Sequence, residues 1–189
     1  MDSNPCTDKL TDIEYLEHMI PHHQVAVDMC NLLIPVTCDP QMLNLCRNIK
    51  RIQEYEIWEM NNMKKLLISN DYMRGLFNKN DIQTTMDIYH PKLSKDKSGD
   101  CNPLFFKPND HSKHMKHMKI NRKSFLEHMI PHHQVAIDMS KRLLLHSQNT
   151  YLIEFCRELI IEQQGEIYLM NNLLNSNNFI YNSNLLCDV

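Results

Sequence analysis

The sequence predicts an all-α protein, a four-helix bundle built from two repeated helical hairpins that are joined by a long crossover. Three observations support this. A fourteen-residue segment occurs twice, apolar residues recur at helical spacing in and after each copy, and the 189-residue chain has only 3 glycines. So little glycine disfavours hairpin-rich β folds and glycine-rich phosphate loops, which need residues that tolerate positive φ.

The repeat is the strongest feature of the chain. LEHMIPHHQVAVDM begins at Leu16 and LEHMIPHHQVAIDM begins at Leu126, with 13 of 14 positions identical at an offset of 110 residues. At the same offset, residues 46–62 share Cys-Arg, Gln, Glu-Ile and Met-Asn-Asn with residues 156–172. Two separate blocks kept at one spacing indicate that they meet in space.

Each half of the chain is expected to form two helices. The predicted spans are 12–34, 40–69, 122–147 and 150–175. The predicted start signals are the capping-box pairs Thr11/Glu14 and Ser124/Glu127 and the N-caps Asp39 and Asn149. Residues 70–121 hold two of the three glycines and many Lys, Asp and Asn. We expect them to form a surface crossover between the first repeat, residues 1–69, and the second, residues 122–189, which pack as one domain.

A proline precedes the His-His pair in each copy of the repeat, at Pro21 and Pro131. A proline inside a helix costs about 3 kcal/mol and frees the carbonyl four residues back. Because the start signals lie well before them, we expect both prolines inside helices, bending them so that the imidazoles point into the core. The alternative places each proline in the first turn of its helix, where it costs little.

Histidine and methionine share the core side of the first helix in each half. At about 100° per residue, His22 and His23 fall on two adjoining stripes of that side. Glu17 and Asp28 fall on the opposite face, where we expect them to face water.

Glutamine and glutamate interrupt the apolar stripe of each second helix. Gln53 and Glu56 lie one turn apart in the first half, and Gln163 and Glu166 match them in the second. An unpaired buried amide costs roughly 1–3 kcal/mol and an unpaired carboxylate more. The facing stripes offer only histidines as polar partners. We therefore infer a His/Gln/Glu/Met cluster, either inside each half or across the bundle axis.

The donor atoms of this cluster suit a soft metal ion. The chain has 13 Met, 11 His and 7 Cys, and thioether with imidazole is the mixture that selects Cu(I), with Ag(I) behaving alike. Zinc would need only the histidines and a carboxylate, and iron in a di-iron bundle would need Glu-x-x-His motifs, which the sequence lacks. A metal-free His–Glu hydrogen-bond network is the alternative. The predicted ligands, or residues that orient them, are His18, Met19, His22, His23, Met29, Gln53, Glu56, Met60, His128, Met129, His132, His133, Met139, Gln163, Glu166 and Met170.

Two further groups of metal-binding residue types have alternative interpretations. In the crossover, HSKHMKHMK contains His111, His114 and His117 and is either a flexible metal-gathering segment or a solvated basic stretch. Cys46 and Cys156 occupy equivalent core positions and are expected to be small buried apolar residues. Thiolate ligation, or a disulfide between the hairpins, is the other interpretation.

Composition and chain start exclude several classes of function. A formal charge of −3 gives no electrostatic footprint for nucleic acid. No apolar run approaches the roughly 18 residues of a membrane span. The first residues lack the apolar stretch of a signal peptide, so we expect a cytoplasmic or virion location and a reducing compartment. The histidines have no nucleophile placed beside them for covalent catalysis.

The string Y/F-L-E-H-M-I-P-H-H-Q-x-A-x-x-M, followed about thirty residues later by Q-x-x-E-I-x-x-M, resembles the signature of a ferritin-like family of uncharacterised proteins. The resemblance covers residues 15–65 and 125–175. Members carry one or two copies, mostly in secreted bacterial proteins and also in large DNA viruses, and some are periplasmic copper binders rich in Met and His. It implies a helical bundle and a metal site centred on His22-His23 and His132-His133. The missing export signal, the long crossover and the cysteines depart from the family pattern.

These observations favour a non-enzymatic protein that binds metal ions, with Cu(I) as the expected metal and zinc or iron as alternatives. Sequestration, storage or tolerance of the metal would be its role, and no protein partner is indicated. Two other functions stay open: a ferritin-type di-metal oxidoreductase, and a metal-free scaffold or virion component whose polar core fixes the helix register.

Overall fold

The computed structural model describes residues 3–69, 101–117 and 119–176. Within these ranges the chain is helical and has no strand, so the all-α prediction is confirmed. The elements are α1 (Asp12–Leu33), α2 (Pro40–Ser69), the short 3-10 helix η1 (Pro103–Phe106), α4 (Pro108–His117), α5 (Arg122–Leu143) and α6 (Thr150–Asn175). None of the helices in these ranges has the length and apolar character needed to cross a bilayer.

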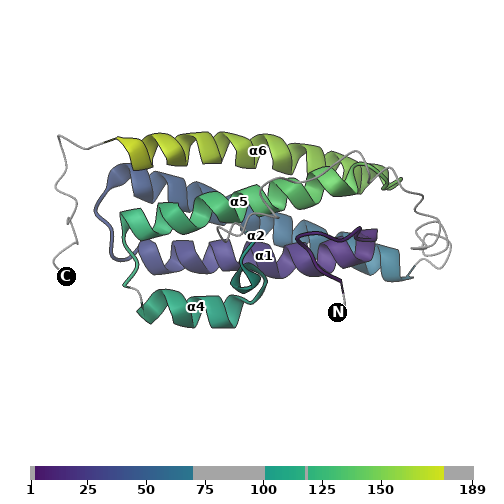
Figure 1. Cartoon of the computed structure of the whole chain (residues 1–189), viewed down its shortest axis with the longest axis horizontal. Helices are drawn as coiled ribbons and strands as arrows, with labels where there is room; N and C mark the ends of the chain where they lie inside the picture. Colours follow the sequence, from purple (N-terminus) through teal and green to yellow (C-terminus); the bar gives the residue numbers. More distant parts are fainter. Residues whose placement is uncertain (1–2, 70–100, 118, 177–189) are drawn as a thin grey trace.

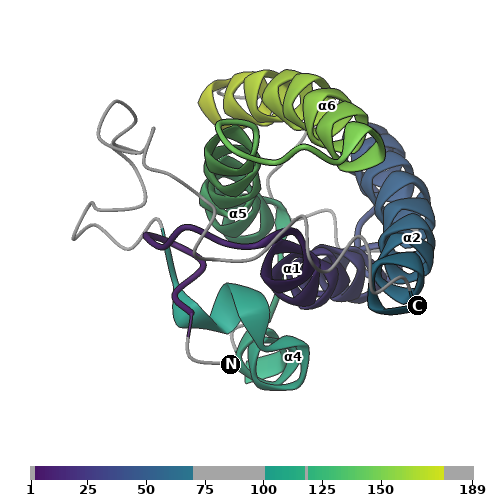
Figure 2. The same ribbon diagram turned by 90° about the vertical axis from the view of Figure 1, so that its right-hand side faces the viewer.

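The four long helices form a bundle of two hairpins. α1 packs along α2, α5 packs along α6, and α1 contacts α5 across the bundle. The end-on view shows these helices around a common axis, with α4 outside the bundle against α1 (Figures 1 and 2). The predicted helices match closely, although α5 ends at Leu143 rather than near residue 147, because the chain turns there.

Local capping explains where the helices begin. Thr11 and Glu14 form the predicted capping box, since each backbone N–H donates to the other's side chain, at 2.9 and 3.2 Å. The predicted box at Ser124 and Glu127 is wrong. Asn121 caps α5 instead, with Ser124 as its reciprocal partner at 3.0 Å in both directions, because Asn121 offers a favoured cap one turn earlier.

The second helix of each hairpin has the N-cap that the sequence predicted. Asp39 Oδ1 accepts from the backbone N–H of Gln41 at 2.9 Å. Asn149 Oδ1 accepts from the backbone N–H groups of Tyr151 and Leu152 at 3.1 and 3.3 Å. Short polar side chains at these positions therefore set where α2 and α6 start.

Both repeat prolines lie inside helices. Pro21 is well within α1 and Pro131 is at the equivalent place in α5. The alternative, in which each proline occupies a first turn, is therefore wrong. That the prolines bend the helices stays a prediction.

The described part of the crossover is packed against the bundle. η1 and α4 contact α1, and Phe105, His111 and Met115 are buried. Residues 111–117 are therefore not a fully solvated stretch, because α4 buries His111 and Met115 and exposes its lysines. That this segment gathers metal ions stays a prediction. Residues 70–100 and 118 of the predicted crossover lie outside the described residues.

The outer face of α1 is less exposed than the sequence suggested. Asp28 accepts hydrogen bonds from Gln24 at 2.8 Å and from Ser112 of α4 at 3.1 Å. Glu17 pairs with Lys64 of α2 at 3.0 Å and is one-quarter exposed. The expectation that these carboxylates face water is wrong in this respect, because α4 and the end of α2 supply partners that helical periodicity does not reveal.

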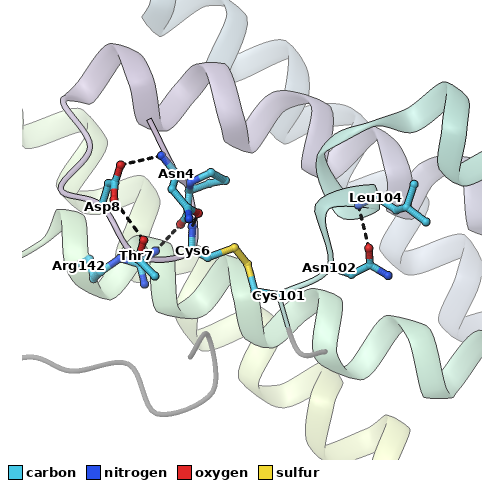
Figure 3. The surroundings of a disulfide bond; sticks show 9 residues. Asn4, Cys6, Thr7, Asp8, Cys101, Asn102, Leu104 and Arg142 are labelled. Carbon is cyan, nitrogen blue, oxygen red and sulfur yellow. Dashed lines mark hydrogen bonds between the residues drawn. A yellow bond between two sulfur atoms is a disulfide. The ribbon is translucent and has the colours of Figure 1, made fainter. Parts of the chain in front are cut away.

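A disulfide joins the N-terminal segment to the chain just before η1. Cys6 and Cys101 are bonded, with their Cα atoms 6.1 Å apart across a separation of 95 residues (Figure 3). Disulfides persist chiefly in oxidising environments. This bond therefore opposes the expectation of a reducing compartment.

The repeat cysteines are buried free thiols. Cys46 lies beside Cys30 in one apolar cluster, whereas Cys156 lies in the other, so a disulfide between Cys46 and Cys156 is wrong. Burial raises the pKa of Cys156 to about 12, so this thiol stays protonated at neutral pH. Cys46 and Cys156 are therefore small buried residues of the apolar core, as the sequence analysis expected.

Candidate metal centre

A polar layer divides the bundle core into two apolar clusters. In each long helix the buried apolar residues change from one cluster to the other at two polar side chains, with Ile137 of α5 as the exception. The members of the polar layer are His22, His23, Gln53, Glu56, His132, His133, Gln163 and Glu166. Seven of the eight are buried and Glu166 is nearly so, with 13% of its side chain exposed. The interruptions seen in the sequence therefore meet in one layer across the bundle.

A pair of stacked histidines lies at the contact between the hairpins. The rings of His22 in α1 and His132 in α5 have centroids 3.6 Å apart and planes 25° apart. His132 Nε2 donates to the backbone carbonyl of His22 at 2.9 Å, which leaves Nδ1 of the neutral ring as an acceptor. Burial, with smaller repulsions from neighbouring histidines, lowers the pKa of both rings well below its ordinary value. Both imidazoles are therefore neutral at pH 7 and retain lone pairs for a metal.

Each outer histidine is held by the glutamate of its own hairpin. His23 Nε2 donates to Glu56 at 3.0 Å, and His133 Nε2 donates to Glu166 at 2.7 Å. Nδ1 of both rings has no hydrogen-bond partner among the described residues. Carboxylates bound in this way orient a ligand histidine and raise its basicity. The glutamate pairing inferred from the sequence is confirmed, and it lies inside each half.

The methionines, in contrast, combine residues from both hairpins. One apolar cluster contains Met19, Met60 and Met139, and the other contains Met29, Met129 and Met170. Each methionine of one group is equivalent to a methionine of the other at the repeat offset of 110 residues. Each group therefore takes two methionines from one hairpin and the third from its partner, one group on each side of the polar layer.

Several buried polar atoms of this layer have no hydrogen-bond partner among the described residues. An unsatisfied buried group costs about 1–3 kcal/mol, against about 5–15 kcal/mol for the stability of a whole domain. The atoms are Nδ1 and Nε2 of His22, Nδ1 of His23, His132 and His133, Oε1 of Glu166 and both amide atoms of Gln53 and Gln163. A bound cation would satisfy the ring nitrogens.

The donor set decides which ion fits. Across the described ranges, no three His, Cys, Asp or Glu side chains are grouped closely enough to hold a metal. A site in this layer therefore needs methionine sulfur from the neighbouring clusters, or a small movement of the rings. Imidazole combined with thioether suits a soft ion better than zinc or iron.

The remaining predicted histidines contact the N-terminal segment and the crossover. His18 is hydrogen-bonded to Ser3 Oγ at 3.0 Å and lies edge-on to Phe106. His128 Nδ1 donates to the backbone carbonyl of Ser124 at 2.8 Å, and its ring neighbours His111 and His114 of α4. The structure therefore places His18 and His128 beside these segments, in surroundings that differ from each other.

Sequence reasoning missed the aromatic cover of the stacked pair. The ring centroids of Phe105 and His132 are 5.1 Å apart, and those of Phe106 and His22 are 5.2 Å apart. Both phenylalanines belong to η1, which the disulfide at Cys101 ties to the N-terminal segment. The signal was present as Pro-Leu-Phe-Phe, a short apolar run inside a polar crossover.

The fold and the polar layer define the chain as an all-α helical bundle that carries imidazoles and carboxylates between two apolar clusters. The chain belongs to the family described as "Domain of unknown function (DUF305)", whose model matches residues 12–174. The resemblance to a family of uncharacterised proteins is confirmed.

Solved structures share this fold. The Ag-bound form of CopM, prepared by soaking, has a TM-score of 0.59 at 25% identity, over 88% of this chain and 96% of CopM. The Cu(I)-bound form of CopM gives 0.58 at 25% identity, over 87% and 95% of the two chains. A DUF305 fragment from Deinococcus radiodurans gives 0.53 at 20% identity, over 86% and 94%, and is similar in fold.

A curated relative is a viral protein. "Uncharacterized protein L153" of Acanthamoeba polyphaga mimivirus is 40% identical over 55 residues, which are 29% of this chain and 36% of that protein. The match thus spans about a third of the relative's length.

Proposed function

We propose that this protein binds Cu(I), or Ag(I) in its place, in the polar layer and serves to sequester or store it without catalysing a reaction. The observation that carries the proposal is the stacked pair of His22 and His132, whose neutral rings offer unpartnered nitrogens between two methionine groups. CopM, similar over most of both chains, has been solved with Ag, Cu(I) and Cu(II) bound.

The residues divide into ligands and residues that orient them. His22, His132 and the methionines beside the layer would supply the soft donor atoms. Glu56 and Glu166 already hold His23 and His133, so their role is to fix ring orientation with Nδ1 free. The amides of Gln53 and Gln163 would accept or donate hydrogen bonds in the same layer. When bound, the metal would supply bonds to nitrogen and sulfur that hold the two hairpins together.

The metal-free scaffold accounts for only part of this layer. The His–Glu pairs need no metal, and they would fix helix register by themselves. However, neither ring nitrogen of His22 nor either amide atom of Gln53 has a hydrogen-bond partner among the described residues. A purely structural polar core would be expected to satisfy these groups. Metal binding therefore accounts for these unpartnered atoms, which a role in fixing helix register alone does not explain.

An anaerobic titration with Cu(I) against a competing chelator tests this proposal. We expect the protein to bind about one to two ions per chain, since its donors are soft and occur once per repeat. His22→Leu with His132→Leu should weaken binding at least 100-fold. His146→Asn is the matched histidine control, because His146 is bonded to the Leu10 carbonyl in a different part of the bundle.

The methionines are tested by a volume-conserving change. Met19→Leu with Met129→Leu should weaken Cu(I) binding, whereas Met42→Leu, also fully buried, should leave it unchanged. Equal affinity of the wild type and the His22/His132 double variant would contradict the proposal. A melting temperature that does not respond to Cu(I), Zn(II) or Fe(II) would favour the scaffold, and oxygen consumption with Fe(II) would favour the oxidoreductase.

A further inference from the structure

α4 places two crossover histidines beside a histidine of the second repeat. We propose that His111, His114 and His128 form a second metal site, separate from the polar layer, that binds a borderline divalent cation such as Cu²⁺ or Zn²⁺. The His128 ring centroid lies 6.3 Å from that of His111 and 6.2 Å from that of His114. The proposal uses other residues and another type of ion than the Cu(I) site, so it stands independently of it.

His111 is the buried member of the cluster. It is 1% exposed, and neither of its ring nitrogens has a hydrogen-bond partner among the described residues. Phe105 packs against it with a centroid distance of 6.3 Å. A buried imidazole with two unsatisfied nitrogens costs free energy that a metal–nitrogen bond would recover. The His111 ring thus has Phe105 and His128 as ring neighbours at the same centroid distance of 6.3 Å.

The hydrogen bond of His128 prepares it to be a ligand. Its Nδ1–H donates to the backbone carbonyl of Ser124 at 2.8 Å, so the neutral ring carries its lone pair on Nε2. Histidines that bind metals commonly donate their other nitrogen to a carbonyl or carboxylate in this way, which fixes the tautomer and the ring direction.

His114 supplies the solvent side of the cluster. It lies three residues after His111 on α4, which places the two side chains on neighbouring turns of the helix. His114 is exposed and His128 is half-buried, whereas His111 is buried. A cation at this position would therefore be reached from solvent, unlike one in the polar layer, and would keep a coordination position open for water.

Metal binding requires the rings to move slightly. Bonds of about 2.0 Å from zinc to two imidazoles in tetrahedral geometry put the ring centroids about 5 Å apart. The observed 6.2 and 6.3 Å are about 1 Å longer, in accord with the lack of a preformed group among the described residues. Rotation of the exposed His114 would close its share of this difference without disturbing the core or the hydrogen bond of His128 to Ser124.

An imidazole-only site differs in ion preference from the polar layer. Imidazole suits Zn²⁺ and Cu²⁺, whereas the thioethers beside the polar layer favour Cu(I). The full-length protein with His22→Leu and His132→Leu removes the core ligands, so divalent binding can be measured alone. Cu²⁺ and Zn²⁺ chloride are added in separate titrations, followed by isothermal calorimetry and, for Cu²⁺, by electron paramagnetic resonance.

We expect one equivalent of divalent ion per chain, with nitrogen hyperfine structure in the Cu²⁺ spectrum. Adding His114→Asn to this background should weaken binding at least tenfold. His117→Asn, an exposed histidine of the same helix, is the matched control and should leave binding unchanged. Because His114 is exposed, its substitution does not disturb packing. Binding of either ion with this pattern supports the site and identifies the ion it prefers.

Two results would overturn this site. One is a protein that binds neither divalent ion, and the other is equal affinity of the His114→Asn and His117→Asn variants. Failure here is distinguishable from failure of the Cu(I) proposal. His114→Asn in the otherwise unaltered protein should leave the anaerobic Cu(I) titration unchanged, whereas the His22/His132 double variant should lose Cu(I) and keep the divalent site.

Discussion

The two hairpins begin with nearly identical helices that meet different surroundings. α1 and α5 share the repeat. In each hairpin, the second residue of the His-His pair is hydrogen-bonded to a glutamate of the other helix, His23 to Glu56 and His133 to Glu166. η1 and α4 pack along α1, however, so His18 meets Phe106 while its counterpart His128 meets α4 histidines. The comparison teaches that duplication fixes the inner contacts, whereas the single, unduplicated crossover makes the outer contacts unequal.

The Cys6–Cys101 disulfide ties the unduplicated segments together, and its removal should cause the largest loss of stability among these predictions. Its closure of a 95-residue separation contributes about 4–5 kcal/mol in the chain-entropy account of unfolding. Cys6→Ser with Cys101→Ser should lower the free energy of unfolding by up to this amount, as measured by urea denaturation. A variant as stable as the wild type would mean that packing alone holds η1 and the N-terminal segment in place.

Acid should destabilise the metal-free protein through the stacked pair. The unfolded chain protonates its histidines near pH 6.5, whereas burial keeps His22 and His132 neutral in the folded protein. The unfolded state therefore binds more protons below about pH 6.5, and stability falls as pH falls, by at most about 1.4 kcal/mol per pH unit for each histidine. Melting temperatures at pH 7.5 and 5.5 measure this slope.

The matched comparison for acid sensitivity is the His22→Leu/His132→Leu variant, which should melt with a shallower dependence on pH. His117→Asn, which replaces an exposed histidine of α4, serves as the control outside the stacked pair. The same slope in the double variant and the wild type would assign the acid sensitivity to other histidines and contradict the role given to the pair.

A smaller change in stability is expected from substitutions at a position where the two copies of the repeat carry different residues. Tyr15 and Phe125 are equivalent, but only Tyr15 has a hydroxyl, which is hydrogen-bonded to Ser140 Oγ at 2.7 Å in the buried core. Tyr15→Phe should cost about 1 kcal/mol because Ser140 loses its partner. Phe125→Tyr should cost about 1–3 kcal/mol by overpacking. Thermal unfolding measures both, and no loss in Tyr15→Phe would show that Ser140 finds another partner.

Helix boundaries and the polar partners of the histidines were predictable because their causes are local or energetic. Asp39, Asn149 and the Thr11/Glu14 pair lie next to the helices they start, so nearby residues reveal them. Glu56 and Glu166 could be paired with histidine because a buried carboxylate needs a partner and few candidates faced it. The misassigned cap of α5 shows the limit, since the sequence analysis took Ser124 as the cap whereas Asn121, three residues earlier, caps the helix in the structure.

By itself, the sequence determined the helical class, the twofold repeat, the helix spans to within a few residues and the residue types gathered in the polar layer. Tertiary structure alone decided that His22 stacks on His132, that each methionine group crosses between hairpins, and that η1 and α4 cover one side. The reason is physical. Periodicity and capping depend on neighbours within a few residues, whereas the register between helices and the placement of a crossover depend on side chains far apart in the chain that only packing brings together.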